Sequence, residues 1–416
     1  MTDNEAPKLP PMSVDDPEAP PPGPPPTPDD VRGILAGVMD PELHASITDL
    51  EMVRDVRVTT DGDVTVKVAL TTAGCPLRHQ IQQDVESKIH GLPGVREVSV
   101  EYGEMTQDEK SAVMQRARWE ARERAPETEV SASTRVLAIA SGKGGVGKSS
   151  VTVNLAAALA AQGRDVGVLD ADIWGFSVPR MLGVDGRLGG TEGKIEPNVV
   201  DVPGRDGAGA SDGTIKVVSM GFLVDDDASA LMWRGLILSR ALEQFLTDVR
   251  WGELDYLLID MPPGTGDIQM ALARLLPSTE LLVVTTPALA AQRVATRVAD
   301  MARRSYLKVA GVIENMSAYV APDGSRHAVF GTGGGDALAR EIDAPLIGSV
   351  PLEPAVSTGG DAGTPVVLSD PDSPAATELR RIAAEISQTV LPPVEMAGCT
   401  ARIFEAAQAN LAANQT

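Results

Sequence analysis

The segment that most restricts the fold of this chain is SGKGGVGKSS at residues 141–150. It follows a short apolar run, RVLAIA at 135–140, and precedes a stretch of helical spacing that starts at Lys148. Glycines between a strand and a helix let backbone N–H groups crowd around a phosphate at the helix N-terminus. The segment therefore predicts a phosphate site at the sheet edge of an α/β fold.

Short apolar runs and helical stretches alternate around this loop. Runs of this kind are typical of strands buried on both faces of a parallel sheet. The further runs are 165–170, 255–260, 280–286, 308–316 and 345–350, and the helical stretches are 148–162, 233–248, 288–305 and 373–388. The alternation predicts an α/β doubly wound, mostly parallel sheet over 134–390. Glycine-rich residues 186–217 interrupt it, and we expect a surface hairpin there.

The rest of the chain divides by composition. Residues 1–28 are a proline-rich tail that cannot bury apolar surface, and 391–416 form a C-terminal tail. Residues 29–103 predict a small α/β domain preceding the P-loop-containing domain, with helices at 31–38 and 76–90, a hairpin around Asp61-Gly62-Asp63 and a last strand at 95–103. Residues 104–133 predict a charged helical linker that opens with a capping box, Thr106 to Glu109.

Composition excludes several classes of function. A net charge of −22 and 3% aromatic residues argue against nucleic acid as a partner, because neither phosphate neutralisation nor base stacking is supplied. Two cysteines exclude a disulfide framework and a four-thiolate site within one chain. No apolar run is long enough for a membrane span, and the N-terminus lacks a secretory pattern. We expect a cytoplasmic protein with no membrane partner.

Two motifs overlap in residues 141–150. Three glycines fit the dinucleotide fingerprint G-x-G-x-x-G, and a plain glycine turn is a third interpretation. The P-loop pattern G-x-x-x-x-G-K-[ST] is favoured, since Lys148 would reach the terminal phosphates of ATP and Ser149 would bind Mg²⁺. Asp260, ending the run DYLLID, supplies the distant carboxylate for the metal. The predicted nucleotide-binding residues of the loop are Gly142, Gly144, Gly145, Val146, Gly147, Lys148, Ser149 and Ser150.

Further polar residues follow the predicted strands. Asp172 is the candidate for orienting the attacking water, whereas Asp170 is expected to be structural; a helix-cap cluster is the alternative for both. The segment DMPPGTGD at 260–267 predicts a switch whose glycines approach the γ-phosphate. Asn315 is a candidate for reading adenine, and an ordinary turn residue is the equal alternative.

A second lysine, Lys143, lies inside the loop. The pattern GKGGVGK[ST] resembles the deviant Walker A loop of the MinD, ArsA and nitrogenase iron-protein ATPases. That resemblance implies an ATP-bridged homodimer in which Lys143 reaches the partner's nucleotide and offsets transition-state charge. A solvated charge on a tight turn is the alternative.

Taken together, the motifs resemble the Mrp/ApbC family of ATPases. The segments that carry the resemblance are SGKGGVGKSSVTVNLA, DADIWGFSVPRMLG, YLLIDMPPGTGD, GVIENMS, FGTGGGDALA and VPLEPAVSTGGDAGTP. DPELHASITDLEMVRDVRV and LTTAGCPLRHQI resemble the small domain of iron–sulfur maturation proteins. The resemblance implies an ATPase that binds iron–sulfur clusters and transfers them to apoprotein clients.

One segment departs from that family. Members that bridge a cluster carry C-x-x-C after the ENMS block, and here those positions are Ala321 and Gly324. Asp323 and His327 are poor substitutes for soft thiolates. The remaining candidate thiolates are Cys75 and Cys399, either of which could equally be structural or incidental. Two functions stay open: a cluster carrier, and an ATP-switched dimer that docks a protein client without holding a cluster.

Overall fold

The structure is a computed structural model of the 416-residue chain. It describes residues 23–40, 46–70, 78–106, 108–110, 112–113, 125–185, 187–191, 193–204, 212–223, 235–264, 266–305, 307–321 and 323–393. The chain forms two compact units, residues 1–117 and 118–416. Each unit is described by itself below.

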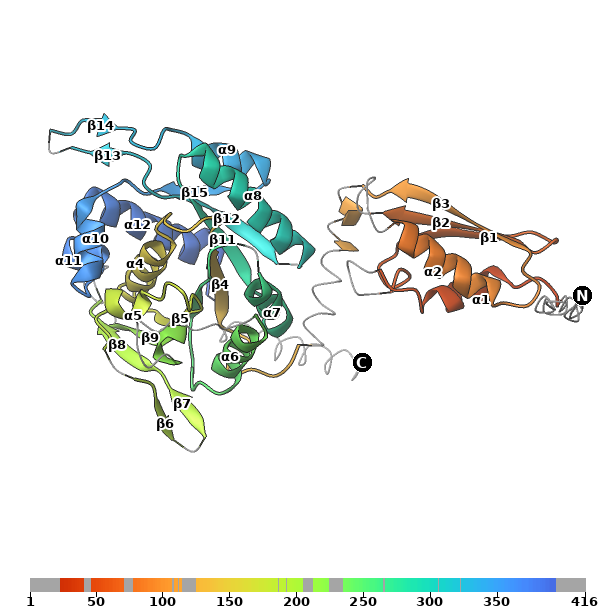
Figure 1. Ribbon diagram of the computed structural model, residues 1–416, viewed down its shortest axis with the longest axis horizontal. Coiled ribbons are helices and arrows are strands. Elements are labelled where there is room, and N and C mark those ends of the chain that lie inside the picture. The colour runs from red at the N-terminus through yellow and green to blue at the C-terminus, as the bar shows by residue number, and fades with distance from the viewer. Residues whose placement is uncertain are drawn as a thin grey trace, which may run out of the picture. The chain divides into compact units, whose positions relative to one another are not determined.

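Over its described residues, the first unit contains a three-stranded sheet and the helices α1 and α2, with further helical residues at 108–110 and 112–113 (Figure 1). Its elements are α1 (Pro28–Leu35), β1 (Val53–Val58), β2 (Asp63–Leu70), α2 (Arg78–His90) and β3 (Glu97–Glu104). β1 and β2 form the expected hairpin, and β3 pairs parallel to β2 after the α2 crossover. Both helices bury apolar residues, such as Leu35 and Val85. The predicted capping box is present, since the backbone N–H of Thr106 donates to Glu109 and that of Glu109 donates to Thr106 Oγ1.

The second unit is built on an eight-stranded sheet of order β15-β12-β11-β4-β10-β5-β9-β8. The strands are β4 (Arg135–Ala140), β5 (Asp165–Asp170), β8 (Asn198–Val202), β9 (Gly213–Ser219), β10 (Tyr256–Asp260), β11 (Glu280–Thr285), β12 (Lys308–Glu314) and β15 (Leu346–Ser349). All neighbours pair in parallel except β8, which runs antiparallel to β9 at the edge. The predicted doubly wound α/β fold is confirmed.

Helices cover both faces of this sheet (Figure 1). They are α4 (Lys148–Ala160), α5 (Val178–Met181), α6 (Gly235–Thr247), α7 (Asp267–Leu275), α8 (Leu289–Arg304), α9 (Gly334–Glu341), α10 (Pro354–Asp361), α11 (Val366–Ser369) and α12 (Pro374–Glu385), with a 3₁₀ turn at Met220–Leu223 and a π-helical turn at Ile386–Val390. The remaining short strands are β6 (Gly189–Thr191), β7 (Lys194–Glu196), β13 (Tyr319–Val320) and β14 (Arg326–His327).

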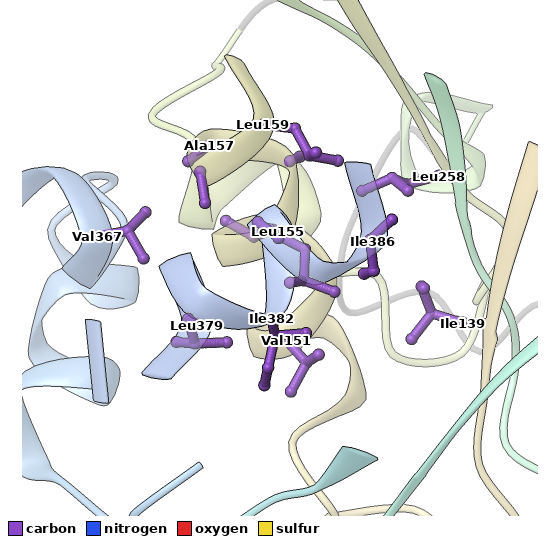
Figure 2. Close-up of a cluster of buried hydrophobic side chains, with 14 of the residues drawn as sticks. Ile139, Val151, Leu155, Ala157, Leu159, Leu258, Val367, Leu379, Ile382 and Ile386 are labelled. Carbon is purple, nitrogen blue, oxygen red and sulfur yellow. The ribbon is translucent and has the colours of Figure 1, made fainter. Parts of the chain in front are cut away.

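The two faces carry separate hydrophobic cores. Along β4, Leu137 and Ile139 point into the core beneath α4 and α12, whereas Val136 and Ala138 point into the core beneath α6, α7 and α8. Figure 2 shows the first core, where Leu155 of α4 and Ile382 of α12 belong to the same cluster as Ile139 of the sheet. Successive side chains of a strand alternate between faces, so a strand covered on both sides must be apolar throughout.

The expectation for residues 186–217 is wrong in part. β6 and β7 do form a hairpin, but β8 and β9 extend the main sheet beyond β5. β9 buries Ile215 and Val217 in the core, and residues 205–211 between the two strands lie outside the described ones. The glycines that flank β8 and β9 make this segment resemble a surface turn, which is why the sequence does not predict these two strands.

Candidate nucleotide site

The glycine loop runs directly from β4 into α4. Gly147 occupies the position before the helix with φ of +80°, a left-handed conformation that costs other residues energy. Gly142 packs against α8, where a Cβ atom would come within 2.3 Å of the Val294 carbonyl carbon. The two glycines therefore fix the course of the loop, which leaves the N-terminus of α4 open toward a cavity.

One ammonium group and two hydroxyl groups converge on Asp260 at the end of β10. Lys148 Nζ lies 2.7 Å from Asp260 Oδ1, and the Ser149 hydroxyl donates to Oδ2 at 2.6 Å. The Thr152 hydroxyl, one turn further along α4, lies 3.0 Å from Oδ1. Asp260 is completely buried, and a buried carboxylate is tolerated only with such partners. Thr152 was not among the predicted residues, although its spacing from Ser149 on one helix places it on the same side.

The Ser149 hydroxyl and the Asp260 carboxylate fit a magnesium ion. They are hard oxygen ligands, brought together from a P-loop serine and the end of a neighbouring strand. Over the part of the chain that the structure describes, His, Cys, Asp and Glu form no group of three that could hold a metal. Magnesium suits this arrangement, because it is usually bound by one or two protein ligands together with substrate phosphates.

Two further carboxylates follow β5. Asp170 is fully buried, and burial together with the neighbouring Asp260 raises the pKa of Asp170 to about 7. Asp172 is nearly buried; burial raises its pKa, and the Lys148 charge opposes that effect. The Asp172 Oδ1 atom is buried without a hydrogen-bond partner among the described residues. Asp172 is thus the carboxylate with an unused acceptor.

A cavity of about 410 Å³ joins these groups. It is lined by residues from the P-loop and from the segment after β5, among them Gly144, Gly145, Gly147, Lys148, Ser149, Ser150, Asp172, Trp174 and Met181, whereas Gly142 does not line it. The sequence-predicted residues Lys148, Ser149 and Asp172 therefore share one cavity, with Asp260 directly beneath Ser149. A phosphate there would meet backbone N–H groups at a helix N-terminus and a lysine ammonium group.

Lys143 and Asn315 have different surroundings. Lys143 is exposed, and its ammonium group has no hydrogen bond or ion pair to any residue in the described ranges. Asn315 is buried beneath the loop, where its side-chain amide donates to the Val146 carbonyl oxygen at 2.9 Å. Asn315 is not among the residues that line the cavity. Its described side-chain contact is with the loop backbone.

The segment predicted as a switch connects the loop to α7. The backbone N–H of Gly264 donates to the Ser141 carbonyl oxygen at 2.9 Å. The buried Gln269 side chain, which sequence reasoning missed, donates to the Gly264 carbonyl oxygen at 2.9 Å. These two bonds tie the strand-end segment both to the P-loop and to the first turn of α7.

The positions expected for a C-x-x-C lie in the turn between β13 and β14. The Ala321 N–H donates to the Ser325 carbonyl oxygen, and Gly324 has φ of +82°. Asp323 accepts bonds from Ser325, which lower its pKa, and Ser325 Oγ lies 2.9 Å from His327 Nε2. Both candidate thiolates, Cys75 and Cys399, lie outside the described residues. In the described ranges, no helix combines the length and the apolarity needed to cross a membrane.

Comparison with known proteins agrees with these observations. A family model described as NUBPL iron-transfer P-loop NTPase matches residues 132–387, and a model described as iron-sulfur cluster assembly protein matches residues 28–101. A Mycobacterium leprae protein named iron-sulfur cluster carrier protein is 45% identical over 364 residues, which cover 86% of this chain and 92% of that protein. A Synechocystis protein of the same name is 41% identical over 366 residues, covering 88% of this chain and 98% of that one.

Among solved structures, a nucleotide-binding protein from Archaeoglobus fulgidus in complex with ADP is similar to this chain. It is 32% identical and has a TM-score of 0.46, and the match covers 59% of this chain and 91% of that protein.

Proposed function

The chain belongs to the family of NUBPL iron-transfer P-loop NTPases, and from that premise we propose that it is an ATP-hydrolysing homodimer that carries iron–sulfur clusters to apoproteins. The observation that carries the nucleotide half of the proposal is the convergence of Lys148, Ser149 and Asp172 on one cavity above the buried Asp260. The cargo half rests on the names of relatives that match most of the chain.

The residues divide the work of hydrolysis. Backbone N–H groups of the glycine loop and of the first turn of α4 bind the phosphates, and Lys148 exchanges its contact with Asp260 for phosphate oxygens. The Ser149 hydroxyl and Asp260 would hold magnesium, which would supply positive charge to offset that of the phosphates. Asp172 uses its unpartnered oxygen to orient the attacking water, and its raised pKa makes it a better proton acceptor.

Lys143 is proposed to act on the nucleotide bound by the partner subunit. Its exposure and its lack of contacts within the described residues leave the ammonium group available to a second copy. A complementation experiment tests this. Lys143→Ala and Asp172→Ala should each be nearly inactive. Mixing them should restore activity, because one site of the mixed dimer combines an intact Asp172 with the partner's intact lysine.

If Lys143 instead acted on the nucleotide bound by its own subunit, the mixture would be as inactive as the two variants alone. Lys148→Ala provides the baseline, since loss of the ammonium group from the loop should abolish hydrolysis in every combination. Wild-type hydrolysis by Lys148→Ala would overturn the assignment of the P-loop itself.

The cargo is proposed to be held by cysteine thiolates, with Cys75 and Cys399 as the candidates. One copy of each per subunit gives four per dimer, the number that a cluster commonly uses. The alternative is a dimeric ATPase that docks a client without holding a cluster. The motivation for this alternative is Ala321 and Gly324, which stand where the resembling family has thiolates and which cannot ligate iron.

Anaerobic reconstitution with iron and sulfide separates the two functions. Iron, acid-labile sulfide and the visible spectrum are measured for the wild type, Cys75→Ala and Cys399→Ala. A stoichiometric cluster lost in one variant supports the carrier and identifies its ligand. If no sample retains iron while ATP is still hydrolysed, the client-docking alternative holds.

A further inference from the structure

The loop after β5 forms one wall of the nucleotide cavity. Residues 171–178 carry Asp172, Trp174 and Ser177, all of which line that cavity. Trp174 is 63% exposed, so burial of its own side chain does little to hold the loop in place. The loop must therefore be fixed through its backbone if Asp172 is to meet the nucleotide at a defined position.

A single buried carboxylate supplies much of that fixation. Asp170 Oδ1 accepts a bond from the backbone N–H of Asp172 at 3.2 Å. Asp170 Oδ2 accepts bonds from the backbone N–H groups of Ser177 at 3.2 Å and of Val178 at 3.3 Å. The Ser219 hydroxyl, at the end of β9, donates to the same Oδ2 at 3.1 Å. One side chain thus ties both ends of the loop to the edge of the sheet.

The position of Asp170 makes burial of its carboxylate energetically costly. It is completely buried and is paired in register with Asp260 on the adjacent strand β10. Burying a second acid beside the first costs free energy, which hydrogen bonds from the loop partly offset. An apolar side chain would avoid the cost but would leave three backbone N–H groups to find other acceptors.

We propose that Asp170 is a positioning residue for ATP hydrolysis: it holds residues 172–178 so that the Asp172 carboxylate faces the cavity before nucleotide binds. The inference rests on the proposed role of Asp172. It assigns Asp170 no contact with substrate, and the Asp170 carboxylate acts only through the loop that it anchors. Ser219 assists by fixing one oxygen of that carboxylate.

The decisive variant is Asp170→Asn, which keeps the size of the side chain and replaces one acceptor oxygen with a donor. We expect kcat to fall about 10- to 100-fold, as for loss of hydrogen bonds to a charged group. The dissociation constant of ADP, measured by calorimetry, should change less than about threefold, because the phosphate-binding loop is untouched. Hydrogen exchange of the 171–178 amides should become faster in the nucleotide-free protein.

A double variant separates positioning from general structural damage. If Asp170 acts through Asp172, Asp170→Asn should cost no further kcat once Asp172→Ala is present. The matched control is Asp165→Asn, at the opposite end of β5, where the carboxylate is exposed and accepts a bond from Thr214. This control should leave kcat and the exchange of 171–178 unchanged.

Several results would overturn the inference. They are a wild-type kcat in Asp170→Asn, a kcat loss without faster exchange, and a full additional loss in the double variant. Should Asp170→Asn not fold, Ser219→Ala decides, because it removes one of the four donors. It should lower kcat about threefold and accelerate exchange at 177–178; unchanged values would refute the role. Exchange is measured without ATP, so it tests the anchoring even if the proposed role of Asp172 fails.

Discussion

Replacing Gly147 by alanine should destabilise the nucleotide-free protein more than the same substitution at Gly144 or Gly145 of the loop. Two penalties combine at this position. The backbone has φ of +80°, and an added Cβ would lie 2.3 Å from the Nδ2 atom of Asn315. The displaced Asn315 amide would lose its bond to the Val146 carbonyl oxygen.

The magnitude follows from these two terms. A left-handed backbone costs a non-glycine residue about 1–2 kcal/mol. Loss of the bond between Asn315 and Val146 adds about 1 kcal/mol, since both groups are buried. We therefore expect the free energy of unfolding to fall by about 2–3 kcal/mol in Gly147→Ala. Urea titration without nucleotide, followed by far-ultraviolet circular dichroism, measures this difference.

The same loop supplies two matched controls. Gly145 has φ of +79° but open space around its Cβ position, so Gly145→Ala reports backbone strain alone. Gly144 has open space and no left-handed backbone, so Gly144→Ala should be neutral or slightly stabilising. Equal losses in Gly147→Ala and Gly145→Ala would show that the Asn315 contact contributes nothing. Equal stability of all three variants would refute the strain argument.

Three further predictions concern the same site. Thr152→Val removes one donor to Asp260 at nearly constant side-chain volume, so it should raise the Mg²⁺ concentration for half-maximal ATP hydrolysis about tenfold. Thr152→Ser keeps the hydroxyl and should leave that concentration unchanged. The same half-maximal Mg²⁺ concentration in Thr152→Val and the wild type would contradict this role. Asn315→Ala should weaken ATP binding more than GTP binding if the amide reads adenine, and an unchanged ratio of the two dissociation constants would limit Asn315 to supporting the loop. Burial raises the pKa of Asp170 to about 7, so the folded state binds this proton more tightly than the unfolded chain does. Asp170 therefore makes the free energy of unfolding fall as pH rises from about 4 to 7. Asp170→Asn should flatten that part of the profile of unfolding free energy against pH, and an unchanged slope would refute this prediction.

The sheet could be predicted from sequence because its strands are covered on both faces. Leu137 and Val136 belong to different cores, yet both must be apolar, so β4 appears as one uninterrupted run. β8 follows another rule, since it lies at the sheet edge and alternates between half-buried and exposed residues. Such a strand has no continuous apolar run, which explains why the sequence predicts only a surface hairpin in the glycine-rich segment around it.

The site was predictable where a residue type and its spacing carry the chemistry. Lys148, Ser149 and Asp260 belong to that group, because the motif demands a lysine, a hydroxyl and a carboxylate at the end of a strand. Thr152 and Gln269 act through contacts made by the fold, with Asp260 and with the Gly264 carbonyl oxygen. A buried hydroxyl or amide has no sequence pattern of its own, so only the packed structure identifies these two residues.

The order of strands explains why three distant segments make one site. β10 lies between β4 and β5, and all three run parallel, so the P-loop, the loop after Asp170 and the segment after Asp260 leave the sheet at the same edge. The ends of the strands are also linked directly, since the Ala171 N–H donates to the Asp260 carbonyl oxygen and the Met261 N–H donates to that of Ile139. These bonds connect the three loops to one shared central strand.

The turn at Ala321–Gly324 is built differently. The bonds of its described residues lie within the hairpin of β13 and β14, and the described side chains are half-buried or exposed. Substitution of thiolates in this turn therefore leaves intact the bonds among β4, β10 and β5 that assemble the nucleotide site. The nucleotide site can thus keep its geometry whether or not this turn carries thiolates, so direct measurement of bound iron is more informative than ATPase activity for the proposed cargo.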